Sequence, residues 1–222
     1  MGGECKSSLT LPRRSMLAGA IATLILSKTH PAEATNFLTF RICSPALNER
    51  FKNWWNQAEH FGRDLMGSTN ARVVQFRSHI DGVPRNRGLI EFFRGISSLV
   101  NSAAPYAEDL KSRHGNDQWA TPIEFLKNGG DCEDFALTKA ATLYSLGWPL
   151  DSTYLLIGVL DKLPKNIARH AVLVVMPDKR RKVHLVLDSM TDLILDIRDY
   201  HAFRPIYRIN RQGVSMFVPA RH

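Results

Sequence analysis

Three features are scarce or missing in this 222-residue sequence. It has only 3 cysteines, too few for a disulfide-stabilised small scaffold or for a pair of four-cysteine zinc sites. It has no run of about 18 or more apolar residues, so a conventional membrane-spanning helix is not expected. Internal repeats and low-complexity segments are also lacking, and nothing in the sequence indicates a second domain.

What is present suffices for one folded domain. Hydrophobic residues make up 44% and charged residues 23% of the chain, a composition that buries a sizeable core and argues against global disorder. The net charge is +8, yet no recognised nucleic-acid-binding motif accompanies it, so nucleic acid is not an expected partner. The densest basic run, Lys179–Lys182, is expected to be a solvated turn, and docking to an acidic partner is the alternative.

Residues 1–34 are expected to be a cleaved export signal, which leaves residues 35–222 as the mature domain. The signal has a positive start, an apolar middle and a small-x-small exit: Lys6, Arg13 and Arg14, then Met16–Leu26, then Ala32–Ala34. The Arg13-Arg14 pair also resembles a twin-arginine signal, so both the Sec and the twin-arginine routes stay open. The alternative, an amphipathic helix of the folded domain, is disfavoured because the stretch lacks a polar face.

The first half of the mature chain has helical periodicity, and the second half is rich in β-favouring runs. Helices are expected at 47–66, at 88–101, from Thr121-Pro122 to Asn128, and from Asp131 to about Gly147, whereas 72–84 is expected to be a loop. Short strands are expected at 37–43, 153–160, 168–176, 182–188, 193–197, 205–209 and 215–218. Helices followed by strands favour an α+β fold with a largely antiparallel sheet.

Cys132 is the candidate nucleophile. It follows Gly129, Gly130 and Asp131 and lies where the third long helix begins. A thiol in the first helical turn is close to the positive end of the helix dipole, which favours the nucleophilic thiolate. The alternative is a buried cysteine that acts as a small apolar residue, but the adjacent Asp131, Glu133 and Asp134 do not suit an apolar pocket.

His170 and Asp188 are the candidate partners of this thiol. A hairpin centred on Lys179 places His170 opposite Asp188 on the same face of the sheet, close enough for a hydrogen bond. The histidine would take the thiol proton, and the carboxylate would orient the ring. A slip of one residue would separate the two side chains, and His184 is a rival base. Asp192 and Asp196 are rival acids.

These segments resemble a known family. The matching blocks are Trp119-Ala120-Thr121-Pro122-x-Glu124-Phe125, then Gly130-Asp131-Cys132-Glu133-Asp134-Phe135-Ala136-x-x-Lys139, then Arg169-His170-Ala171-Val172-Leu173 and Leu187-Asp188. They are similar to the bacterial transglutaminase-like cysteine proteases, the LapG-like periplasmic group. The resemblance implies a papain/transglutaminase-like core, with the catalytic cysteine at a helix N-terminus packed on an antiparallel sheet. It also implies a Cys132–His170–Asp188 triad.

The same resemblance implies a substrate, a regulator and a metal. Family members cut at a pair of small residues near the N-terminus of a large surface adhesin, under the control of an inner-membrane receptor for cyclic di-GMP. A bound Ca²⁺ supports activity, and the resemblance assigns it to Asp131 and Glu133. The acidic residues also give a physical reason to expect a cation here. Their uncompensated negative charge would raise the pKa of Cys132, and a hard cation would cancel that effect. Helix capping by the same acidic residues is the alternative.

Several alternatives remain open from the sequence. The same triad would also serve an acyltransferase that passes the acyl group to an amine. A catalytically silent binding module and a structural disulfide between Cys43 and Cys132 are further readings. For the oxyanion hole, the Cys132 N–H is the natural first donor, and the segment around Trp119 is a candidate for the second.

Overall fold

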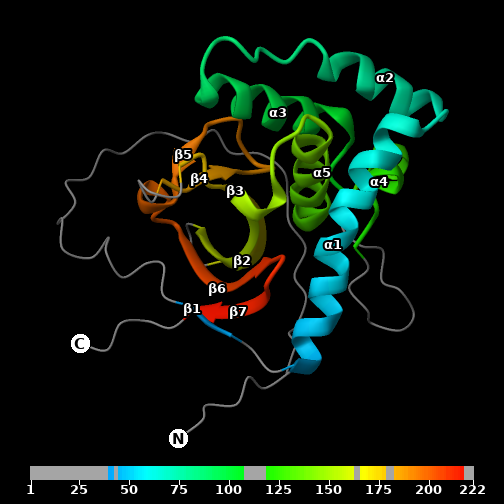
Figure 1. The fold of residues 1–222 in the computed structure, drawn as a ribbon. Coiled ribbons are helices and arrows are strands. Elements are labelled where there is room, and N and C mark those ends of the chain that lie inside the picture. Colours follow the sequence, from blue (N-terminus) through cyan, green and yellow to red (C-terminus); the bar gives the residue numbers. More distant parts are fainter. Residues whose placement is uncertain (1–39, 43–44, 108–118, 163–165, 179–182, 218–222) are drawn as a thin grey trace, which may run out of the picture.

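A computed structural model describes residues 40–42, 45–107, 119–162, 166–178 and 183–217. Its helices gather on one side of the molecule and its strands form a curved sheet on the other, with helix α5 between them (Figure 1). This arrangement confirms the expected α+β fold. The expected export signal and the basic run Lys179–Lys182 lie outside the described residues, as does Cys43.

The helices of the described segments are α1 (Pro45–Gly67), α2 (Ala71–Ile80), α3 (Leu89–Ala103), α4 (Pro122–Asn128) and α5 (Cys132–Ser145). Helix α5 is the centre of the packing, since every side chain from Glu133 to Leu143 is buried. A helix that is buried all round must be covered on several sides, and α1, α3, α4 and strand β3 supply that cover. No helix in the described part of the chain is both long and apolar enough to cross a bilayer.

The expectation of a loop at 72–84 is wrong, because most of this segment is helix α2. The Asn70 side chain accepts a hydrogen bond from the Arg72 N–H and so caps the helix start. Val73, Phe76 and Ile80 are buried along one face of α2, a helical spacing that the interspersed polar residues obscure.

The turn between α4 and α5 fixes the start of α5. Thr121 caps α4 through its hydroxyl, which accepts the Glu124 N–H. Gly129 ends α4 with a φ of 83°, and a Cβ there would lie 2.4 Å from the carbonyl oxygen of Pro105. Only glycine fits this conformation and this close contact. Asp131 then becomes the N-cap of α5, as the sequence predicts.

Within the described segments the sheet has seven strands in the order β1-β7-β6-β2-β3-β4-β5, and every paired neighbour is antiparallel. Their bounds are β1 Phe40–Ile42, β2 Thr153–Lys162, β3 Asn166–Val175, β4 Leu185–Leu187, β5 Leu195–Asp196, β6 Phe203–Asn210 and β7 Gly213–Phe217. Each expected strand is present in the structure, with some ends moved by a few residues.

The two faces of the sheet bury different sets of side chains. The helix-facing side contributes Leu173, Val175 and Leu187 to the main core around α5. The opposite side buries a smaller cluster that includes Val172, Val174 and Phe203. Alternation along β3 therefore places both faces in apolar surroundings, which explains its nearly continuous apolar sequence.

The expected register of the β3–β4 hairpin is wrong by two residues. Val174 pairs with Val186 rather than with His184, and Leu173 pairs with Leu187. Successive side chains of a strand alternate between faces, so an even slip keeps every side chain on its expected face. His170 and Asp188 consequently still share a face, although they are diagonal neighbours and not a directly opposed pair.

Candidate active site

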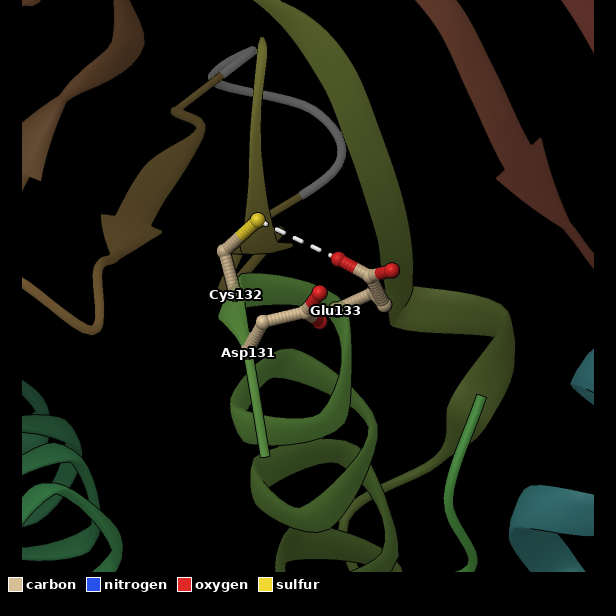
Figure 2. A group of neighbouring side chains, drawn as sticks. All are labelled: Asp131, Cys132 and Glu133. Atoms are coloured by element: carbon tan, nitrogen blue, oxygen red, sulfur yellow. Dashed lines mark hydrogen bonds between the residues drawn. The ribbon is translucent and has the colours of Figure 1, made fainter. Parts of the chain in front are cut away.

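Cys132 is the first residue of α5, and its free thiol is partly buried. Figure 2 shows this thiol beside the carboxyl groups of Asp131 and Glu133, and the thiol donates a hydrogen bond to Glu133 Oε2 at 3.2 Å. Burial raises the pKa of Cys132 well above its usual value, and the negative charges of Glu133 and Asp131 raise it further. The effect of the two carboxylates thus opposes that of the helix dipole.

His170 and Asp188 form a buried pair. His170 is 6% exposed and Asp188 is 2% exposed, and His170 Nε2 lies 2.6 Å from Asp188 Oδ1. Burial alone would raise the pKa of Asp188, but the hydrogen bond and charge of His170, together with hydrogen bonds from Tyr200 and Met190, outweigh it, so the pKa lies below the usual value. The carboxylate is therefore ionised at neutral pH and can fix the orientation of the imidazole ring.

Two further donors complete the shell of the Asp188 carboxylate. The Tyr200 hydroxyl donates to Oδ2 at 2.5 Å, and the Met190 N–H donates to Oδ1 at 3.0 Å. Tyr200 follows a short 3-10 helix at Ile197–Asp199 and stacks on Phe203, whose ring also contacts His170. Tyr200 is not predicted as a site residue from the sequence, because only the turn after β5 brings it back to β4.

Cys132 lies against β3, the strand that carries His170. Strand β4 pairs with β3 only from Leu173 to Val175, and within the described residues the rest of that edge of β3 has no strand partner. A hydrogen bond from the backbone of Ala171 reaches Cys132 and lowers the pKa of its thiol. The thiol thus lies beside the residue that follows His170, although no hydrogen bond joins Cys132 to His170 in the described part of the chain.

The rival residues have other partners. His184 Nδ1 lies 2.9 Å from the Tyr154 hydroxyl, and burial lowers its pKa. Asp196 caps a short helix and pairs with Arg198, while Asp192 accepts a hydrogen bond from Asn101. Of the two histidines and three aspartates considered, His170 and Asp188 are the pair in contact.

Asp134 has a structural role at the start of α5. Its Oδ1 accepts the Ala120 N–H at 2.6 Å, and its Oδ2 accepts the Asp131 N–H at 3.2 Å. The carboxylate, 1% exposed, therefore ties the segment before α4 to the N-terminus of α5. This contact brings the residue after Trp119 close to the helix end that carries Cys132.

Asp131, Cys132 and Glu133 form a compact group of potential metal ligands, with one ligand atom from each lying within 4.8 Å of the others. The two carboxylates are the hard oxygen ligands that Ca²⁺ prefers, whereas a thiol is a soft ligand that it does not. Asp134 is less suited to join them, since both of its oxygens accept backbone N–H groups. The donor chemistry of Asp131 and Glu133 therefore fits a hard divalent cation.

Lys139 and Asn101 were not recognised as site residues from the sequence, although Lys139 is part of the motif quoted above. Lys139 is completely buried, and its Nζ donates to the main-chain oxygen of Asp188 at 2.7 Å. Asn101 Nδ2 donates to the same oxygen at 3.1 Å. Besides that motif, the signal in the sequence is a charged residue at a core position of an apolar helix.

Solved structures of LapG from Legionella pneumophila are similar to this chain. The calcium-bound form is 25% identical, with a TM-score of 0.57, and the match covers 74% of this chain and 90% of that one. The EGTA-treated form is 26% identical, with a TM-score of 0.55, and the match covers 72% of this chain and 84% of that one. No curated protein sequence matches the chain. Residues 74–208 match the family of bacterial transglutaminase-like cysteine proteinases (BTLCP), and the chain belongs to this family of cysteine proteases.

Proposed function

We propose that the protein is an exported, periplasmic cysteine endopeptidase that acts through Cys132, His170 and Asp188. The observation that carries this proposal is the buried 2.6 Å contact between His170 and Asp188, on a strand whose Ala171 backbone contacts a thiol at a helix N-terminus. Family membership supports peptide-bond hydrolysis. The proposed substrate is the N-terminal region of a large surface adhesin, and the proposed regulator is an inner-membrane receptor for cyclic di-GMP. Both follow from the sequence resemblance.

The proposed reaction begins with proton transfer from the Cys132 thiol to His170. Because Nε2 of His170 is bonded to Asp188, Nδ1 is the ring nitrogen that takes the proton. The sulfur then attacks the scissile carbonyl carbon, and the Cys132 N–H at the start of α5 is a donor for the resulting oxyanion. His170 returns the proton to the leaving amine, and water hydrolyses the thioester to release the acid and restore the thiol.

We also propose that the enzyme is calcium-assisted, with Asp131 and Glu133 as protein ligands. The calcium-bound form of the similar LapG supports a role for calcium, and the grouping of the Asp131 and Glu133 oxygens supports the choice of ligands. A cation held there would supply positive charge that offsets the two carboxylates, which raise the pKa of the Cys132 thiol. The remaining oxygen ligands would come from backbone carbonyls or water.

The test compares wild type and Cys132→Ala on N-terminal adhesin fragments, with Ca²⁺ and with EGTA. We expect cleavage by wild type alone, reduced by EGTA and restored by Ca²⁺. Equal cleavage by both proteins would refute the nucleophile, and cleavage and melting temperature that are unchanged after exhaustive chelation would refute the metal. An added amine acceptor reports acyl transfer as a separate product. Periplasmic location is tested by fractionating cells that carry the full-length protein.

A further inference from the structure

A buried lysine contacts the back of the proposed triad. Lys139 is 0% exposed, and its Nζ donates to the Asp188 carbonyl oxygen at 2.7 Å. Burial of an amine is unfavourable for the charged form, and burial lowers the pKa of Lys139 to about 7. The nearby charges of Asp188 and Asp192 offset part of that effect. Because burying an amine in the core is unfavourable, a buried lysine at this position indicates a specific role.

Lys139 and Cys132 lie on the same helix, seven residues apart. Seven residues are close to two turns of an α-helix, so the two side chains share a face about 10 Å apart along the axis. Helix α5 therefore carries the proposed nucleophile at its end and a contact to Asp188 two turns later. One rigid helix thus carries Cys132 and also contacts the main chain of Asp188.

The main chain of Asp188 lies beyond the β3–β4 pairing, so side chains rather than a neighbouring strand hold it in place. The last pair between β3 and β4 is at Leu187, one residue earlier. Side-chain donors take over at Asp188, with Lys139 from α5 at 2.7 Å, Asn101 from α3 at 3.1 Å and Ser97 from α3 at 3.4 Å. Lys139 makes the shortest of these three hydrogen bonds and is the donor that comes from the cysteine-bearing helix.

We propose that Lys139 is a positioning residue, which anchors the main chain of Asp188 to α5 and thereby sets where the His170–Asp188 pair stands relative to Cys132. The proposal rests on the triad proposed above. Lys139 touches neither substrate nor reacting atoms, and it acts through Asp188. Both the ammonium and the neutral amine can donate to a carbonyl, so the anchor is present on either side of neutral pH.

The variant Lys139→Met distinguishes a purely structural role of Lys139 from a positioning role, because the two roles differ in the expected melting temperature and activity. Methionine fills a similar volume without a buried amine, and the Asp188 oxygen keeps its Asn101 donor. Replacing a buried charge with an apolar side chain of similar size is often neutral or stabilising. The positioning role thus predicts an unchanged or higher melting temperature together with lower activity.

The experiment measures kcat, KM and melting temperature with Ca²⁺ present, on an adhesin fragment that wild type cleaves and Cys132→Ala leaves intact. We expect Lys139→Met to lower kcat about tenfold to a hundredfold, with KM changed less than about twofold, because the substrate does not touch Lys139. Lys139→Gln, which retains an N–H donor, should fall between it and wild type. The matched control is Thr142→Val, because Thr142 is buried on the same helix but bonds to Thr138.

Rates are counted per folded molecule, so a variant that is merely unstable keeps its kcat. A lower melting temperature with unchanged kcat in Lys139→Met and Lys139→Gln would overturn the proposal, as would an equal loss of kcat in Thr142→Val. Alkylation of Cys132 by iodoacetamide gives a substrate-independent readout, and we expect it to slow in both Lys139→Met and Asp188→Asn. If Asp188→Asn retains full activity, the triad itself is wrong. If only Lys139→Met does, the triad stands and the positioning role fails.

Discussion

The two halves of the candidate site differ in how well their polar groups are satisfied. On the sheet side, the Asp188 carboxylate accepts hydrogen bonds from His170, Tyr200 and the Met190 N–H, and its pKa is lowered. On the helix side, the Cys132 thiol is bonded to Glu133 and its pKa is raised. The sheet side thus stabilises the negative charge of the Asp188 carboxylate, whereas the helix side disfavours the thiolate form of Cys132.

If the proposed calcium ion offsets the charges on the helix side, the two halves should respond differently to mutation. The histidine and its carboxylate already have the contact that orients an imidazole ring. The pKa of the thiol, in contrast, is raised by burial and by the negative charges of Glu133 and Asp131. We expect mutations on the sheet side to lower turnover under all conditions. Mutations on the helix side should change how turnover depends on Ca²⁺.

The largest expected effect is that of Asp188→Asn. The amide can no longer stabilise the imidazolium or fix its tautomer, so we expect kcat to fall about a thousandfold or more. Purified protein is assayed on an adhesin fragment at saturating Ca²⁺. Asp192→Asn is the matched control, since Asp192 lies in the same loop but bonds to Asn101. Similar losses in both variants would mean that Asp188 acts by folding the loop alone.

Glu133→Gln tests the helix side, with an expected effect of about tenfold. The substitution removes a negative charge that raises the pKa of Cys132, and it replaces the carboxylate that accepts the thiol proton with a weaker amide acceptor. A decrease of one pKa unit gives about ten times more thiolate at a pH well below the pKa. In EGTA, alkylation of Cys132 by iodoacetamide should therefore be faster than in wild type.

With Ca²⁺ the same variant should gain less activity than wild type, because it lacks one proposed ligand. Glu91→Gln is the control, since Glu91 is on α3 and pairs with Arg94. Slower alkylation of Glu133→Gln in EGTA would show that Glu133 promotes thiolate formation and that the comparison between the two halves is wrong.

Tyr200→Phe should have a smaller effect on the sheet side. It removes one of the hydrogen bonds that lower the pKa of Asp188. A carboxylate whose pKa is lowered by folding stabilises the protein above its unfolded pKa, and this stability is lost as the pH falls through the folded pKa. The variant should therefore begin to unfold at a higher pH in an acid titration, with kcat reduced severalfold at neutral pH. Tyr144→Phe should match wild type.

The sequence predicts side-chain faces better than exact positions. His170 and Asp188 are on the expected face despite a register error of two residues, because alternation depends only on parity. The cap and start of α5 follow from local residue types around Gly129 and Asp131, which the structure confirms. Tyr200 and Lys139 were not predicted, since their partner is distant in sequence and reached through a turn or across the core. No periodic pattern encodes such a contact.

The pH dependence of stability gives the smallest and most specific test of the sheet side. Lys139 has a pKa of about 7 in the folded protein, against 10.5 as the usual value. Between these values the unfolded chain binds more protons, so the stability of wild type should rise with pH in that window. Lys139→Met has no ionisable group at this position and so lacks this contribution to the pH dependence of stability. Its melting temperature should exceed that of wild type by several degrees at pH 7, since the buried charge costs on the order of a few kcal/mol, and the difference should shrink toward pH 10. A difference that stays constant from pH 7 to 10 would mean that the ammonium remains charged in the core, held by Asp188 and Asp192.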